Sequence, residues 1–164
     1  MKLLFVTGSR SEWGYIKPIL KILKKNKIKF DICPTNMHLL DSYGYTVNEI
    51  KKDGFKIDEK IYMALDGYNT YTTTKSLGVF MISFTDTLLR LKPDWVIIAG
   101  DRSESFAASV VSSFNNIPTA HIQAGELSGQ LTSFLSEIFK GSKMIRINQK
   151  EDEESKNADK IIYD

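Results

Sequence analysis

The sequence predicts an α/β fold in which helices cover both faces of a mostly parallel sheet. Short apolar runs such as Trp95–Ala99 lack polar alternation, as strands covered on both faces do. Segments whose apolar residues recur at helical spacing alternate with these runs along the chain. We therefore expect one Rossmann-like domain over residues 1–164, with six or seven strands. Leu3–Val6 and Val96–Ala99 should lie in the interior of the sheet.

Each expected element follows from local pattern. The expected strands are Lys2–Thr7, Phe30–Thr35, Phe55–Tyr62, Trp95–Ala99, Pro118–Gln123, Lys143–Ile147 and Lys160–Tyr163. Helices should end near Lys25 and Asp53, and others should span 75–91, 103–114 and 131–139. Residues 64–74, rich in Gly, Asn, Tyr and Thr, are expected to form a loop, and residues 150–156 a charged helix or turn.

Composition excludes several classes of function. The net charge of +2 is too small to indicate a nucleic-acid partner. The single cysteine, Cys33, excludes an internal disulfide and a thiolate metal cluster, and we expect it to be buried. No apolar run approaches the roughly 20 residues that span a bilayer. We therefore expect a cytoplasmic protein with no membrane partner, no metal and no cofactor; the G-x-G-x-x-G dinucleotide pattern is missing.

Polar residues follow two neighbouring strands of the expected sheet. They are Asp101, Arg102 and Glu104 after the first strand, and His121, Gln123 and Glu126 after the second. Parallel strands bring such residues to one edge, where open sheets bind ligands. Carboxyl groups crowded beside arginines can serve as general acid and base. They can equally form a structural ion-pair network, and the residues alone leave both interpretations open.

Two further candidates follow the first and second strands. Gly8 and Arg10 lie in a turn before a helix, a place where backbone donors and the helix dipole favour an anion. The alternative, slightly favoured, is a tight turn at Gly8 with a solvated Arg10. His38 could contact a ligand, but a lone histidine before a helix is more often a cap or a surface residue, and we favour that interpretation.

Five separate motifs resemble the UDP-N-acetylglucosamine 2-epimerase family. They are TGSRSEWGYIKPIL, PTNMHLL, KSLGVFMISFTDTL, AGDRSE and PTAHIQAGELSG, and the match runs from residue 1 to about residue 129. The sequence looks most like the hydrolysing branch that feeds sialic, legionaminic and related nonulosonic acid synthesis. The resemblance implies the N-terminal half of a GT-B fold, in which two Rossmann-like domains face each other across a cleft.

The resemblance also implies roles for residues. Asp101 matches a family catalytic acid, and His121 and Glu126 match a motif on the rim of the cleft. Arg10 would lie at the nucleotide phosphates, and the resemblance makes Arg102, Gln123 and His38 further substrate contacts. The implied substrate is UDP-N-acetylglucosamine or a GDP- or UDP-linked diacetamido sugar. The family reaction removes the C2 proton, expels the nucleoside diphosphate in an anti elimination, and hydrates the resulting glycal.

The chain also departs from the family pattern. Gln123 replaces a glutamate of many members, although the legionaminic-type branch shares the glutamine. Residues 130–164 diverge: Thr132, Ser136 and Glu137 replace an expected Asp and an Arg-His pair. The resemblance further implies that the C-terminal domain is absent from this chain. This chain would then work as a homodimer or together with a separate chain that carries the C-terminal domain. The alternative is a degenerate paralogue that binds sugar nucleotide weakly or pairs with a full-length epimerase.

Overall fold

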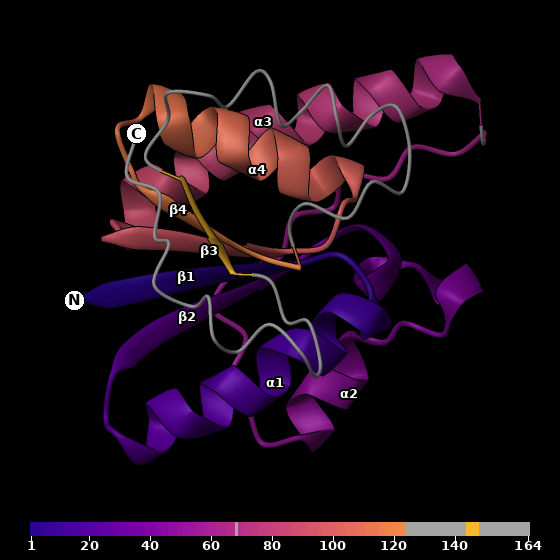
Figure 1. The fold of residues 1–164 in the computed structure, drawn as a ribbon. Helices are drawn as coiled ribbons and strands as arrows, with labels where there is room; N and C mark the ends of the chain where they lie inside the picture. Colours follow the sequence, from indigo (N-terminus) through magenta and orange to yellow (C-terminus); the bar gives the residue numbers. More distant parts are fainter. Residues whose placement is uncertain (68, 124–143, 148–164) are drawn as a thin grey trace, which may run out of the picture.

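A parallel sheet forms the centre of the computed structural model, which describes residues 1–67, 69–123 and 144–147. Figure 1 shows helices on both of its faces. The strands are β1 (Lys2–Thr7), β2 (Lys29–Pro34), β3 (Trp95–Ala99), β4 (Thr119–Ile122) and β5 (Met144–Ile147). Their order is β2-β1-β3-β4-β5, and all four neighbouring pairs are parallel. The prediction that β1 and β3 occupy interior positions is confirmed.

The helices lie where the apolar spacing placed most of them. They are α1 (Arg10–Lys25), α2 (Val47–Lys52), α3 (Thr70–Leu91) and α4 (Ser103–Phe114), with short 3-10 helices η1 (Asn36–Leu39) and η2 (Asp41–Tyr43). Helices α1 and α2 cover one face of the sheet, and α3 and α4 cover the other (Figure 1). Within the described residues, no helix combines the length and the apolar character that crossing a membrane requires.

Two apolar cores follow from the alternation of side chains along each strand. In β1, Leu3 and Phe5 pack on the face with α1, while Leu4 and Val6 pack on the face with α3 and α4. Cys33 is fully buried in the α3 and α4 core, as expected. A sheet with both faces buried explains why the strands read as continuous apolar runs.

The expected strand at Phe55–Tyr62 is wrong. The segment runs beside the edge strand β2, but the amides of Asp58 and Glu59 both donate to the same carbonyl, that of Ile32. The Ile32 amide in turn donates to the Asp58 side chain instead of to a backbone carbonyl, and only an isolated bridge between Thr35 and Ile61 forms. The sheet therefore has five strands among the described residues.

Helix α3 begins earlier than expected. Residues 70–74 belong to the helix rather than to a loop, because Asn69 caps it. The Asn69 side chain accepts from the amides of Tyr71 and Thr72, and the Thr72 hydroxyl accepts in return from the Asn69 amide. The elements predicted at 131–139, 150–156 and 160–163 lie outside the described residues, as do Thr132, Ser136 and Glu137.

Candidate active site at the carboxyl edge of the sheet

The turns after β1 and β3 meet at the carboxyl edge of the sheet. Gly8 ends the first strand so close to α4 that a Cβ atom there would lie 1.8 Å from Oε1 of Glu104. The Gly8 amide donates a hydrogen bond to Oε2 of Glu12, in the first turn of α1. Gly100, in the turn after β3, has φ of +72° and also lies against the Glu12 side chain. Two glycines thus let two carboxyl groups enter the same small space.

Glu104 is fully buried and is held by three side chains. Arg102 donates from Nε to Glu104 Oε1 over 2.8 Å. Asn36 donates from Nδ2 to Oε2 over 3.0 Å, and the Ser103 hydroxyl donates to the same oxygen over 3.2 Å. Asn36 follows β2 and has a positive φ of 47°, a conformation that asparagine adopts more readily than most residues. The carboxylate therefore joins the turns after β2 and β3.

Glu12 is almost as deeply buried but is less well satisfied. Its Oε1 atom has no hydrogen-bond partner among the described residues, although Arg102 Nε lies 3.8 Å away. Burial and, to a smaller extent, the nearby Glu104 charge raise the pKa of Glu12 to about 8, against the lowering effects of the Gly8 amide and Arg102. The Glu12 carboxyl is consequently protonated at neutral pH.

His38 lies behind this turn rather than on the surface. It is fully buried, and its ring nitrogens contact the hydroxyls of Thr7 at 3.1 Å and Thr46 at 2.7 Å. The interpretation as a surface residue is therefore wrong, because η1 turns the ring inward. Burial lowers the pKa of His38 to about 4, so the ring is neutral. Both ring nitrogens have hydroxyl partners, so His38 links the end of β1 to the residue before α2.

The remaining candidates lie around the same edge. Asp101 and Arg10 are exposed, and Arg10 pairs with Glu49 of α2 over 3.2 Å. His121, in β4, contacts the Gly100 carbonyl through Nε2 and is therefore adjacent to the turn that carries Asp101. Gln123 follows β4 with a positive φ of 59°.

The edge thus gathers most of the predicted residues. The carboxyl ends of β1, β3 and β4 bring together Asp101, Arg102 and Gln123 in the turns, Arg10 at the start of α1 and His121 in β4. Glu126 lies outside the described residues. The arrangement offers one exposed carboxylate, partly exposed cationic groups and a buried pair of acids. Such a set can bind an anionic ligand and exchange protons with it.

Sequence reasoning missed Glu12. The available signal was the Ser9-x-x-Glu12 spacing, which is typical of a helix start. Ser9 does cap α1, accepting from the Glu12 amide. What the spacing could not show is that the Glu12 side chain turns into the sheet edge instead of toward solvent.

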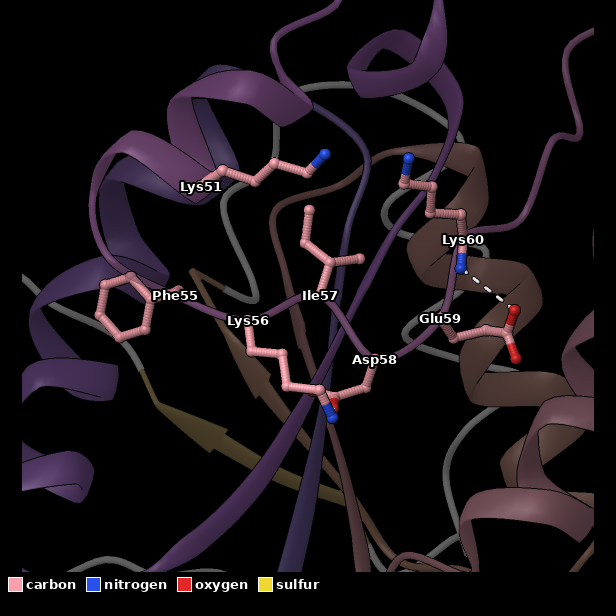
Figure 2. A pocket seen from close by; sticks show the side chains of 7 residues that line it. All are labelled: Lys51, Phe55, Lys56, Ile57, Asp58, Glu59 and Lys60. Carbon is pink, nitrogen blue, oxygen red and sulfur yellow. Dashed lines mark hydrogen bonds and ion pairs between the residues drawn. The ribbon is translucent and has the colours of Figure 1, made fainter.

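A second concavity lies away from this edge. An open cavity of about 560 Å³ is lined by residues 51 and 55–60, beside the middle of β2 (Figure 2). Its acids already have partners: Lys56 pairs with Asp58 over 2.6 Å, and Arg90 pairs with Glu59. It is separate from the carboxyl ends of the strands, where parallel sheets bind ligands. The edge described above is therefore the better candidate.

The fold and this edge define an α/β domain whose parallel strands end beside a set of ionisable side chains. Comparison with known proteins gives a family. The family model described as UDP-N-acetylglucosamine 2-epimerase matches residues 21–140, so the chain belongs to that family.

Named relatives agree with this assignment. The chain is 39% identical over 129 residues to UDP-N,N'-diacetylbacillosamine 2-epimerase (hydrolyzing) of Legionella pneumophila, covering 78% of this chain and 34% of the relative. It is 33% identical to GDP/UDP-N,N'-diacetylbacillosamine 2-epimerase (hydrolyzing) of Campylobacter jejuni, covering 77% and 33%. The chain thus spans about a third of the length of the curated relatives it matches.

A solved structure supports the same conclusion. The UDP-GlcNAc 2-epimerase of Neisseria meningitidis, solved with bound UDP-GlcNAc, superposes with a TM-score of 0.66 at 30% identity. That match covers 81% of this chain and 35% of the other. The fold prediction is therefore confirmed as an α/β parallel sheet of this family.

Proposed function

We propose that this chain is the N-terminal part of a hydrolysing nucleotide-sugar 2-epimerase. The observation that carries the proposal is the carboxyl edge, where the turns bearing Arg10, Asp101 and His121 adjoin. The similarity to hydrolysing relatives, which covers the same residues, supports it. The substrate is a sugar linked to UDP or GDP, with UDP-N-acetylglucosamine and diacetamido sugars as the candidates.

The reaction needs a group that exchanges the C2 proton, a proton for the leaving oxygen, and cations for the diphosphate. In this proposal the exposed Asp101 exchanges a proton with the substrate, and His121 and Glu126 assist on the rim. Arg10 and Arg102 bind the diphosphate, and Gln123 contacts the sugar. Elimination breaks the C1–O bond to the nucleoside diphosphate and the C2–H bond, and water then adds across the glycal.

The test is release of nucleoside diphosphate by the purified 164-residue chain. UDP-N-acetylglucosamine and a GDP-linked diacetamido sugar are supplied separately, and released UDP or GDP is measured. Asp101→Asn should lower the rate by at least about a hundredfold, the usual contribution of an acid–base group. Asp86→Asn, an exposed aspartate of α3, is the matched control and should keep the wild-type rate.

Release that Asp101→Asn leaves unchanged would contradict the role of Asp101. A second function is favoured by the departures at Thr132, Ser136 and Glu137. In that case the chain binds sugar nucleotide without turnover and pairs with a full-length epimerase. Binding without release, together with co-purification of such an epimerase, would distinguish this function from the first.

A further inference from the structure

The Glu12 and Glu104 carboxyl groups face one cation from two different turns. Arg102 Nε lies 2.8 Å from Glu104 Oε1 and 3.8 Å from Glu12 Oε1. The side chains of both acids are at most 3% exposed, whereas that of Arg102 is 34% exposed. Two buried carboxylates with a single cation would leave one negative charge uncompensated in a poorly solvated space.

Among residues 1–67, 69–123 and 144–147, the surroundings supply no second cation. The groups that face the pair from neighbouring elements are Arg102 and Asp101 in the turn after β3, the neutral His38 of η1, and the Gly8 and Ser9 backbone. Arg10 is turned outward and pairs with Glu49. A proton is therefore the remaining means of balancing the charge.

The two acids are not equivalent. Glu104 accepts from three side chains, an arrangement that suits an ionised carboxylate. Glu12 accepts one backbone amide at Oε2, while Oε1 has no hydrogen-bond partner among the described residues. An unpartnered oxygen is tolerated better on a neutral group than on a charged one. The proton accordingly belongs on Glu12.

We propose that Glu12 and Glu104 are a positioning pair that shares one proton: the ionised Glu104 fixes the Arg102 guanidinium, and the protonated Glu12 keeps the site neutral. Arg102 uses Nε for this contact, and its side chain is 34% exposed. In this proposal its Nη groups bind the diphosphate of a nucleotide sugar. This last step rests on the proposed function.

The shared proton predicts a pH dependence of stability that requires no ligand. The pKa of Glu12 is about 8 in the folded chain and 4.5 in its ordinary state. Between these values the folded state holds a proton that the unfolded state has lost, so this group's contribution to stability falls as pH rises. Glu12→Gln, which mimics the neutral acid, should abolish that decline. Glu104→Gln should keep it but move its upper end to lower pH, because the neighbouring charge is removed.

The closing experiment measures two quantities on the 164-residue chain and its variants. Urea unfolding from pH 5 to 9 measures how the free energy of unfolding depends on the proton held by Glu12. Titration with UDP measures the affinity to which Arg102 contributes. Glu104→Gln should weaken UDP binding about tenfold at every pH, the effect of losing one charged hydrogen bond. Wild-type affinity for UDP should fall above pH 8, where Glu12 ionises, and Glu12→Gln should not show that fall. Arg102→Lys keeps the charge but lacks Nε; it should weaken UDP binding while keeping the pH dependence of unfolding, and it serves if Glu104→Gln does not fold.

The outcomes separate this inference from the proposed function. A decline in wild-type stability between pH 6.5 and 8 that persists in Glu12→Gln overturns the shared proton. Unchanged UDP affinity in both Glu104→Gln and Arg102→Lys overturns the positioning role. Loss of that decline in Glu12→Gln, in a chain that binds no UDP, supports the shared proton and contradicts the proposed function.

Discussion

The two ends of the parallel sheet differ in how many buried acids face each cation. At the amino end, Lys2 Nζ pairs with Asp31 over 2.6 Å and also donates to the Leu91 carbonyl. Opposite charges there are matched one to one. At the carboxyl end, Glu12 and Glu104 converge on Arg102, so two buried carboxyl groups face one cation.

This difference indicates what each end does. A matched pair contributes to stability, whereas an excess of buried acid opposes folding and persists where a ligand site needs it. The surplus lies beside Asp101, the residue proposed to exchange a proton with the substrate. The carboxyl end should therefore be sensitive to small changes in volume and pH, and the amino end should not.

The largest expected effect comes from Gly8→Ala. The added Cβ would lie 1.8 Å from Glu104 Oε1 and 2.6 Å from Cδ. The carboxylate cannot move aside without leaving Arg102 and Asn36, so we expect a loss of about 3 kcal/mol or more in the free energy of unfolding. Urea denaturation measures it.

Gly14→Ala is the matched control for that change. Gly14 is an exposed residue in α1, and an added Cβ there would meet nothing within 4 Å. Alanine should stabilise the helix by up to about 1 kcal/mol. If Gly8→Ala behaves like Gly14→Ala, the close packing of Glu104 against the turn is refuted.

Much of this edge could be predicted from the sequence. The unbroken apolar run in β3 and the glycine after it placed Asp101 and Arg102 at the end of an interior strand. Parallel pairing then brought His121 beside them. These features depend on local pattern and on one topological rule, which a single sequence shows.

The rest depends on contacts between residues far apart in the chain. Glu12 at a helix start reads as a cap, and only the approach of Gly8 to α4 makes it a buried acid. His38 reads as a surface residue because its partners, Thr7 and Thr46, carry no sequence signal for such a contact. The alternation in Phe55–Tyr62 indicated a strand, but the Ile32 amide of β2 donates to the Asp58 side chain instead of to a backbone carbonyl, and only an isolated bridge forms.

The two buried titrating groups at the carboxyl end, His38 and Glu12, have opposite effects on how stability depends on pH. The pKa of His38 falls from 6.5 to about 4 on burial, so its contribution to stability is lost as pH falls through that range. The contribution of Glu12 is lost as pH rises from 4.5 to about 8. Between about pH 4.5 and 6.5 the two dependences offset each other, and wild-type stability should be nearly flat there.

Without the titration of Glu12, the pH dependence that His38 gives to stability should become measurable. In Glu12→Gln, stability should fall by up to about 1.4 kcal/mol per pH unit as the pH drops from 6.5 toward 4.5. Urea unfolding at half-unit steps measures this slope. The double variant Glu12→Gln, His38→Gln should lose it, and a slope that remains in the double variant would assign the titration to another group.

The smallest expected effect lies at the amino end. Asp31→Asn removes the charge that faces Lys2, but the Lys2 side chain is 32% exposed, so solvent takes over part of the interaction. We expect a loss of about 1 kcal/mol in unfolding free energy. Lys56→Met, at a pair whose lysine is 85% exposed, is the control and should leave stability nearly unchanged, because solvent screens that pair. Asp31→Asn should also leave UDP affinity unchanged, because Asp31 lies far from the strand ends that form the site. A change in UDP affinity in that variant would mean that charge at one end of the sheet acts at the other, and the contrast between matched and surplus charge would then not separate stability from function.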